Sequence, residues 1–164
     1  MSENQDKYIV RPIEKRDNEQ ISKIIKTVMT EFGAVGCGYS IEDTEVDNMF
    51  DAYGVRAKYF VVEKDGRILG GSGVAQLLNG DADTCELKKM YFLNELRGKG
   101  FGEKLLNLCL KAAKELGYKK CYLETLTQME NAQRLYEKHG FKKLERPMGD
   151  TGHFKCNCWY VREV

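Results

Sequence analysis

LRGKGFGEKLL, residues 96–106, places three glycines at alternate positions beside Arg97 and Lys99 and then continues with apolar residues at helical spacing. A helix that begins directly after glycines exposes unpaired N–H groups, and the helix dipole adds to their attraction for a phosphate or pyrophosphate. Glycine also lets the backbone come close to such a ligand. Because a surface turn that only starts a helix can have the same letters, the rest of the chain must decide.

The segments on either side of these glycines predict a strand, a helix and a second strand. Residues 85–93 read as a strand, one apolar stripe runs from Phe101 to Leu116 and stops at Gly117, and residues 121–126 (CYLETL) read as a strand again. A crossover of this kind is right-handed and joins parallel strands. We therefore expect the chemistry at this parallel pair.

The other expected elements complete one sheet with helices. In chain order they are a strand at 8–12, a helix at 21–32, a polar helix at 41–52, antiparallel strands at 57–64 and 67–78 around Asp65-Gly66, a short helix at 131–139 and closing strands at 142–145 and 154–161. No repeat or linker interrupts this pattern, so residues 1–164 are expected to form a single domain.

Composition excludes several classes of protein. The chain has 164 residues, 42% of them hydrophobic and 31% charged, and a net charge of +1, which argues against nucleic-acid binding. No stretch is long and apolar enough to span a membrane, and the polar start MSENQDKY indicates a cytoplasmic protein. The six cysteines are then expected to be thiols. They lack a C-x-x-C pair, and Cys156 and Cys158 near His153 are more typical of buried thiols than of a zinc site, so no metal is expected.

Two common phosphate-binding patterns fit the glycine stretch poorly. A mononucleotide P-loop needs G-x-x-x-x-G-K and then Ser or Thr, and neither the spacing nor the hydroxyl is present. The dinucleotide fingerprint needs G-x-G-x-x-G in a sheet with several crossovers, although Glu124 could hold a ribose. Here the glycines read G-x-G-x-G, late in the chain and with one crossover.

A third pattern fits. RGKGFG, residues 97–102, follows the strand segment 89–92 and resembles the acyl-CoA signature R-G-x-G-x-G/A of the GNAT superfamily of N-acyltransferases. NAQRLYEKHGF, residues 131–141, is similar to the second motif of that family. The resemblance implies an α/β (α+β) GNAT-like fold: a mixed, mostly antiparallel sheet of about seven strands with a parallel, splayed central pair, flanked by about four helices.

The resemblance also implies acetyl-CoA as the co-substrate. Backbone amides of the glycine loop would hold the pyrophosphate, backbone groups of Met90 and Phe92 would pair with the pantetheine arm, and Asn131 would bind the pantetheine or cap its helix. The cofactor-binding residues expected on this basis are Met90, Tyr91, Phe92, Arg97, Gly98, Lys99, Gly100, Phe101, Gly102 and Asn131.

Acetyl transfer needs an uncharged amine, yet a primary amine with a pKa of about 10.4 is protonated at pH 7. Glu86 matches the position of the general base in the histone-type acetyltransferases of the family, while Glu124 or a water molecule remains an alternative base. Tyr136 matches the family tyrosine that protonates the departing CoA thiolate, unless it serves packing only. Cys109 and Cys121 are expected to be inert, so the amine would attack the thioester directly.

In this family the first two helices and the last hairpin wall the acceptor pocket. Here that includes an acidic segment, which either draws a cationic amine or forms a solvated helix face, and three side chains suited to a small-molecule site. These residues are Glu42, Asp43, Glu45 and Asp47 on the acidic segment, and Tyr39, His153 and Trp159.

The expected function is an N-acetyltransferase that moves the acetyl group of acetyl-CoA directly to a primary amine of a small molecule. A protein N-terminal or lysine acetyltransferase and a non-catalytic CoA-binding sensor or interaction module are the alternatives. The expected partner is the amine acceptor, without nucleic acid or membrane. The sequence leaves open the identity of the acceptor, the physiological acyl group and whether the protein forms a homodimer.

Overall fold

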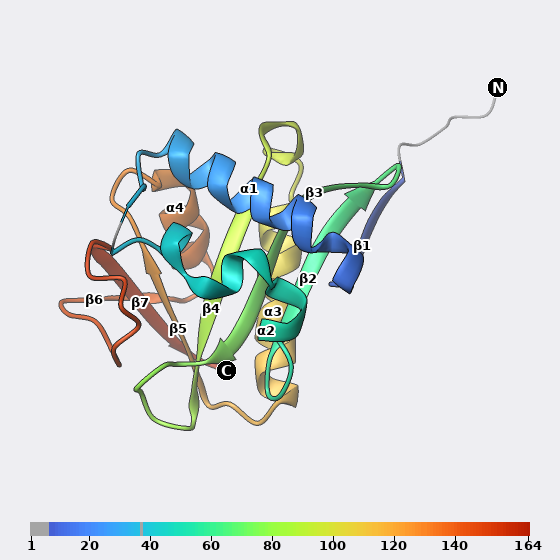
Figure 1. The fold of residues 1–164 in the computed structure, drawn as a ribbon. Helices are drawn as coiled ribbons and strands as arrows, with labels where there is room; N and C mark the ends of the chain where they lie inside the picture. The colour runs from blue at the N-terminus through green and yellow to red at the C-terminus, as the bar shows by residue number, and fades with distance from the viewer. Residues whose placement is uncertain (1–6, 37) are drawn as a thin grey trace.

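A mixed sheet runs through the molecule in the order β1-β2-β3-β4-β5-β7-β6 (Figure 1). The computed structural model describes residues 7–36 and 38–164. All neighbouring strands are antiparallel except β4 and β5, which are parallel. The strands are β1 (Tyr8–Pro12), β2 (Lys58–Lys64), β3 (Arg67–Gln76), β4 (Thr84–Phe92), β5 (Lys120–Thr125), β6 (Lys142–Leu144) and β7 (Cys158–Glu163).

Helices cover both faces of this sheet. The α-helices are α1 (Asn18–Glu31), α2 (Met49–Ala52), α3 (Phe101–Glu115) and α4 (Glu130–Lys138). Helix α1 crosses in front of β3 and β4 in Figure 1, whereas α3 lies behind the sheet. The apolar stripes of α3 and α4 share one buried cluster with Cys85, Leu123 and Tyr160. The expected GNAT-like architecture, with its parallel central pair, is thus confirmed.

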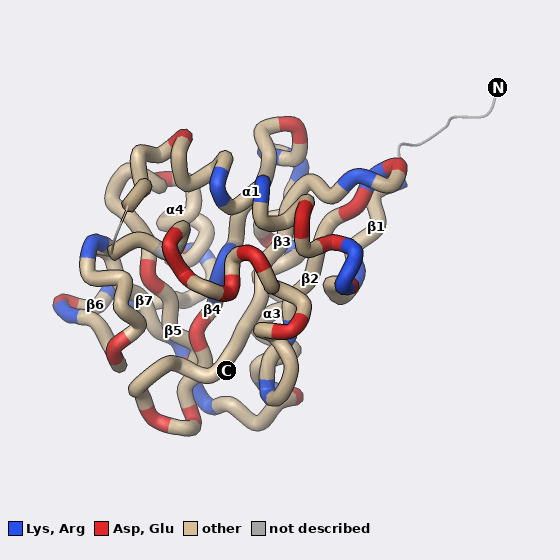
Figure 2. Tube along the Cα trace, in the orientation of Figure 1, with Lys and Arg blue, Asp and Glu red and all other residues tan. Residues whose placement is uncertain are grey.

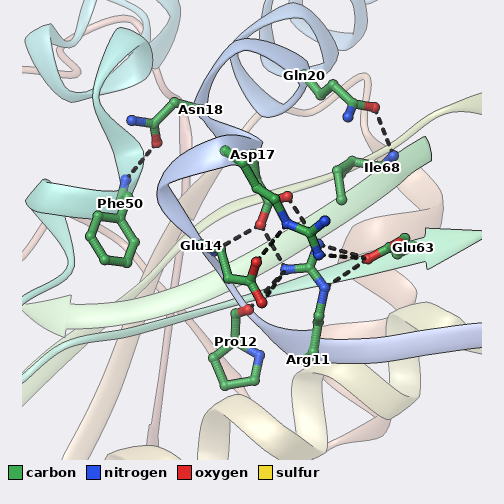
Figure 3. Close-up of polar contacts among 10 residues, drawn as sticks. Arg11, Pro12, Glu14, Asp17, Asn18, Gln20, Phe50, Glu63 and Ile68 are labelled. Atoms are coloured by element: carbon green, nitrogen blue, oxygen red, sulfur yellow. Dashed lines mark hydrogen bonds and ion pairs between the residues drawn. The ribbon is translucent and has the colours of Figure 1, made fainter. Parts of the chain in front are cut away.

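A buried ion-pair cluster fixes the start of α1 on the sheet (Figure 3). Arg11 on β1 donates to both carboxylate oxygens of Asp17 at 2.7 and 2.9 Å and to Glu63 on β2 at 2.7 Å. Within α1, Gln20 accepts a hydrogen bond from the backbone N–H of Ile68 at 2.9 Å. These contacts aim the helix along β3 and β4, so that its far end reaches the cavities described below.

The polar helix expected at 41–52 is wrong for most of its length. The chain forms 3₁₀ turns η2 (Ser40–Glu42) and η3 (Thr44–Asp47) and only then the short α2. Asp43 is extended, with φ −61° and ψ 135°, and Asn48 is also non-helical, so a continuous helix cannot form. This irregular path turns the acidic side chains of Asp43 and Glu45 toward β4.

The last strand begins at Cys158 rather than at residue 154. Residues before it form turns, which are held by a hydrogen bond from the N–H of Cys156 to the carbonyl of His153 at 3.0 Å. The N–H of Lys155 also donates to Gly38 at 3.1 Å. Five cysteines are free and buried, as expected, namely Cys85, Cys109, Cys121, Cys156 and Cys158. The prediction for Cys37 and most of the polar N-terminus lie outside the described residues.

Candidate active site

Strand β4 contains a β-bulge in its middle. Between Lys88 and Tyr91 it has two residues where β3 has one, and Lys89 takes a left-handed backbone conformation with φ +54°. The hydroxyl of Tyr59 donates to the carbonyl of Lys89 at 2.7 Å and so holds the bulge from β2. In a regular strand Lys88 and Lys89 would point to opposite faces. Because of the bulge, both reach the same acidic segment.

Strands β4 and β5 pair in parallel over a short stretch and then separate. Their register covers only Thr84 to Glu86 on β4, after which each strand continues without the other. A cavity occupies the opening and is lined by residues of β4, β5 and α4. It meets a longer groove on one side, with Met90 and Met129 in both linings, and two outer cavities on the other side, with His153 in all three. The opening between β4 and β5 can therefore be reached from two sides, through the groove and through the outer cavities.

The longer groove gathers most of the residues predicted to bind the co-substrate. Its lining also includes Val28 and Phe32 from the C-terminal end of α1. Lys99 is exposed and stands outside the lining. The predicted residues that line the groove are Met90, Tyr91, Phe92, Arg97, Gly98, Gly100, Phe101, Gly102 and Asn131.

The glycine loop has the geometry of an anion cradle. Gly98 and Gly100 adopt left-handed conformations, with φ +75° and +84°, and a Cβ at either position would meet nothing within 4 Å. Gly100 is the N-cap of α3, so the first N–H groups of the helix have no intrahelical partner. Both glycines line the groove, so open space adjoins the start of α3, an arrangement that fits the pyrophosphate of a CoA molecule.

The side chain of Arg97 ties the loop to α1. It donates to both carboxylate oxygens of Glu31 at 2.6 and 3.0 Å and to the carbonyl of Phe92 at 3.1 Å. The guanidinium group is thus already hydrogen-bonded within the protein. This residue supports the groove through its position and backbone, as the glycine-loop interpretation expects.

Tyr136 lies on α4, buried against the apolar cluster of α3 and β7. Its ring meets Phe141 edge-on at a centroid distance of 5.8 Å, and its hydroxyl lies 3.9 Å from the Sδ of Met90. The ring also lines the cavity between β4 and β5. Burial raises the pKa of the phenol above its ordinary value, so Tyr136 keeps its proton at neutral pH.

Asn131 lines the groove but does not cap its helix. Met129 occupies the N-cap position of α4, and Asn131 lies in the first turn, where its Oδ1 accepts a weak hydrogen bond from Arg134 at 3.3 Å. Of its two predicted roles, only contact with the co-substrate is left.

Glu86 is buried at the boundary between the cavity and the outer opening. It is 4% exposed, and the described part of the chain provides no hydrogen bond to its carboxyl group. Burial raises its pKa to about 7, an effect that Lys88 opposes and Glu124 reinforces. Glu86 is therefore not a solvent-exposed strand residue. Its carboxyl group can take up and release a proton near neutral pH.

His153 joins three distant segments into one cluster. Its Nε2 lies 2.7 Å from Oδ1 of Asp43, and its Nδ1 lies 3.3 Å from Oε1 of Glu124. Burial would lower the pKa of this imidazole, but the bonds to the two carboxylates outweigh it and raise the pKa to about 9. Thr151 and Tyr122 donate to the same carboxylate of Glu124. At neutral pH the cluster contains a doubly protonated imidazolium between two carboxylates.

Lys88 and Lys89 complete the charges around Glu86. The Nζ of Lys89, whose side chain is 1% exposed, contacts both Asp43 and Glu45, the latter at 3.0 Å. The Nζ of Lys88 lies 2.7 Å from Glu45. Although burial alone would raise them, the pKa values of Asp43 and Glu45 are lowered by His153 and these lysines. The acidic segment is thus bound to the protein itself and is not a solvated helix face at these two residues.

The only group of potential metal ligands in the described residues is Glu86, Glu124 and His153, whose ligand atoms lie within 4.8 Å of one another. A metal ion would need a nitrogen lone pair of His153, and the imidazolium offers none until its proton is removed. Both nitrogens of His153 are engaged, Nε2 by Asp43 and Nδ1 by Glu124, so these residues form an ion-pair cluster in this structure. The absence of a metal remains a prediction.

Comparison with known proteins gives the family. Residues 22–141 match the Acetyltransferase (GNAT) family. The chain belongs to the GNAT family. It is 38% identical over 158 residues to the uncharacterized N-acetyltransferase YjgM of Escherichia coli, a match that covers 95% of each chain. The expected activity class is thus confirmed: the protein is an N-acetyltransferase.

Solved GNAT structures share the fold at low identity. An acetyltransferase of the GNAT family from Staphylococcus aureus superposes with a TM-score of 0.83 at 21% identity, over 96% of this chain and 99% of the other. An acetyltransferase from Salmonella typhimurium, solved with acetyl-CoA, gives a TM-score of 0.74 at 20% identity, over 95% and 93% of the two chains. No helix in the described part of this GNAT chain has the length and apolar character needed to cross a membrane.

Sequence reasoning on this GNAT protein missed the roles of Lys88, Lys89 and Thr151 in the charged cluster. Alternation along a strand assigns the two lysines to opposite faces, and only the bulge brings them together. Thr151 lies in a turn whose path no local pattern specifies. The available signal is the pair of adjacent lysines within the strand that precedes the glycine motif, because two charges in a central strand need partners.

Proposed function

We propose that the protein transfers the acetyl group of acetyl-CoA directly to a primary amine of a small molecule. The observation that carries the proposal is Glu86, a buried carboxyl group that titrates near pH 7 between the groove and the outer cavities. An ammonium group that enters from the outer side meets this carboxylate before it meets the acetyl donor. Glu86 then takes the proton, directly or through a water molecule.

The reaction that follows needs one base and one acid. The neutral nitrogen attacks the thioester carbonyl carbon, a C–N bond forms, and the C–S bond breaks with its electron pair leaving on sulfur. Tyr136 donates its proton to that sulfur, and the proton on Glu86 returns to solvent. The nitrogen, positively charged after the attack, gives up its second proton to solvent, so the products are the amide and the CoA thiol. Tyr136 regains a proton from solvent before the next cycle.

Buried thiols support direct attack without an acetyl-cysteine stage. Burial raises the pKa of Cys109 to about 12, and a hydrogen bond with Cys85 together with burial raises that of Cys121 well above its ordinary value. A thiol with such a pKa is almost wholly protonated at neutral pH and is a poor nucleophile.

The binding of acetyl-CoA is assigned to the glycine-loop groove. The first N–H groups of α3 would hold the pyrophosphate, and backbone groups of Met90 and Phe92, beyond the stretch where β4 pairs with β5, would pair with the pantetheine amides. Acetyl-CoA supplies the activated acyl group. The cavity between β4 and β5 has a volume of about 60 Å³, which is enough for an acetyl group.

Thiol release from acetyl-CoA, measured over a panel of primary amines and short peptides, tests this proposal. We expect turnover with small amines and a loss of kcat of about 100-fold or more in Glu86→Gln. The exposed carboxylate Glu115 gives the matched control, Glu115→Gln, which should retain full activity. Acetylation of peptides alone would favour a protein acetyltransferase. Tight acetyl-CoA binding without turnover of any amine would favour a sensor.

A further inference from the structure

Lys88 and Lys89, which line the cavity between β4 and β5, are already neutralised by carboxylates of the protein. Lys89 contacts Asp43 and Glu45, and Lys88 contacts Glu45 at 2.7 Å. Lys89 is buried, and the side chain of Lys88 is 18% exposed. Neither ammonium group is therefore free to pair with an anionic group of an incoming molecule.

The remaining cation on this side, His153, is held in the same way. Its two nitrogens face Asp43 and Glu124, at 2.7 and 3.3 Å. Among the described residues that line the central and outer cavities, Lys88, Lys89 and His153 are the only cationic side chains. A carboxylate or phosphate on the acceptor would find no unpaired cation there.

The carboxylates of the same lining outnumber these cations. Asp43, Glu45 and Glu124 are paired, whereas Glu86 has no hydrogen bond from the described residues and Asp150 adds a further acid at the outer opening. Figure 2 shows the acidic segment that crosses in front of β4. The unmatched charge of the lining is negative. One ammonium group on the acceptor would balance it, whereas any additional anion on the acceptor would be repelled.

The outer openings carry exposed apolar side chains. Leu78, 59% exposed, lines the cavity with Glu86, and Phe154, 72% exposed, lines the cavity with Glu124. The loops that carry them are joined, because the N–H of Asp150 donates to the carbonyl of Leu78 at 3.0 Å. Large apolar side chains at the mouth of a charged pocket provide contacts for an apolar substituent.

We propose that the acceptor is a small monoamine with an apolar substituent and with no anionic group near its nitrogen. Free α-amino acids and phosphorylated amines are then excluded by the charges of the site. This inference rests on the proposed function, since it assigns the outer cavities to the acceptor.

Three probes with one side chain test the inference: phenethylamine, L-phenylalaninamide and L-phenylalanine. The amide has the shape of the amino acid without its charge, and the amine of phenylalanine lies between the other two in basicity. We expect kcat/KM for both uncharged probes to exceed that for phenylalanine by at least about 100-fold, because a carboxylate would be left unpaired beside Glu86. Equal or faster acetylation of phenylalanine overturns the inference.

A variant at the mouth makes the test specific for charge. Leu78→Arg places a cation near Glu86 without altering a member of the buried cluster, and we expect the preference for phenylalaninamide over phenylalanine to fall by about tenfold. Leu78→Gln is the uncharged control and should keep the wild-type ratio. If the arginine variant keeps that ratio as well, the selection does not arise from the charges described here.

Failure of the inference is distinguishable from failure of the proposed function. If none of the three probes is acetylated but a small amine that carries an anionic group or lacks an apolar substituent is, the inference is wrong and the proposed function stands. Acetylation of a different uncharged, apolar monoamine supports both. If no amine is acetylated, the proposed function fails, and calorimetry of the three probes with the CoA-loaded protein still decides the inference. Tighter binding of the uncharged probes supports it, whereas tighter binding of phenylalanine, or no binding of any probe, contradicts it.

Discussion

At the scale of single residues, Glu86 should make the fold less stable as the pH rises. Its folded pKa of about 7 lies above the value near 4.3 of an unfolded glutamate, so the folded state binds the proton more tightly. The favourable contribution is fully present below about pH 4 and is lost between there and pH 7. We expect Glu86→Gln to be more stable than wild type at pH 8, by an amount on the order of 2 kcal/mol, in urea unfolding.

The same comparison at pH 4 supplies the control for Glu86. There the wild-type carboxyl group is mostly protonated in both the folded and the unfolded state, so the stability difference between the two proteins should nearly vanish. The exposed-site variant Glu115→Gln should show no such pH dependence. A Glu86→Gln protein that is equally or less stable at pH 8 would mean that the carboxylate is well accommodated when charged and is a poor base near neutral pH.

Tyr136 can be tested by removal of its hydroxyl alone. Tyr136→Phe keeps the ring contacts with Phe141 and removes the proton that would reach the thiolate. If chemistry limits turnover, kcat should fall by about 100-fold to 10,000-fold, with little change in KM for acetyl-CoA or in melting temperature. Phe141→Leu, which alters packing beside the ring, serves as the comparison. Wild-type turnover by Tyr136→Phe would assign the proton to water or to the substrate.

At the scale of elements, the two ends of α3 offer a matched pair of glycines. Gly100 at its start and Gly117 just after its end have φ values of +84° and +87°, and neither position has an atom within 4 Å of an added Cβ. Alanine at either position should cost about 1 kcal/mol of stability through backbone strain. Only Gly100→Ala should weaken acetyl-CoA binding, by about tenfold or more, because only its Cβ enters the anion cradle.

Calorimetric titration of acetyl-CoA into both variants and into Lys99→Ala checks this expectation. The exposed Lys99 lies outside the groove lining, so its loss should matter less than that of Gly100. Equal affinities for all three variants and the wild type would mean that the glycine loop only starts the helix and does not hold the pyrophosphate.

Local patterns predict the regular elements of this fold and miss its irregular ones. The stripe from Phe101 to Leu116 and the Asp65-Gly66 turn each have a period or a turn chemistry that a single sequence displays. The bulge at Lys89 depends on a hydroxyl from β2, and the path of residues 40–52 depends on ion pairs with β4. Tertiary contacts decide such segments, so their sequences carry only weak local signals.

At the scale of the whole molecule, the groove draws on elements from most of the chain. Its lining combines the end of α1, the second half of β4, the start of α3 and the first turn of α4. Acetyl-CoA should therefore stabilise the entire fold. At a concentration of about 100 times Kd the gain is about 2.7 kcal/mol, which corresponds to a rise in melting temperature of roughly 5–10 °C. Differential scanning fluorimetry measures it, and CoA without the acetyl group is the companion ligand. An unchanged melting temperature would contradict the assignment of this groove.

The candidate site could be predicted only in part because its members meet across long stretches of chain. The motif residues from Met90 to Gly102 are contiguous, and a resemblance to a family can find them. Asp43 and His153 are 110 residues apart in the chain, and the local sequence around neither residue indicates that the two are in contact. Glu86 was predicted by its family position, but its burial and unpaired state arise from how β4 and β5 separate.

The buried ammonium group of Lys89 also decides whether the enzyme can acetylate this lysine of its own chain. Lys89 lines the cavity in which amines would be acetylated, so the protein keeps a primary amine of its own close to the acyl donor. Although burial alone would favour the neutral amine, the charges of Glu45 and Asp43 raise the pKa of Lys89 well above its usual value. A permanently protonated nitrogen has no lone pair for attack on a thioester. The two carboxylates thus act as a protecting group for the lysine, and exposed lysines should become acetylated on prolonged incubation with acetyl-CoA while Lys89 stays unmodified.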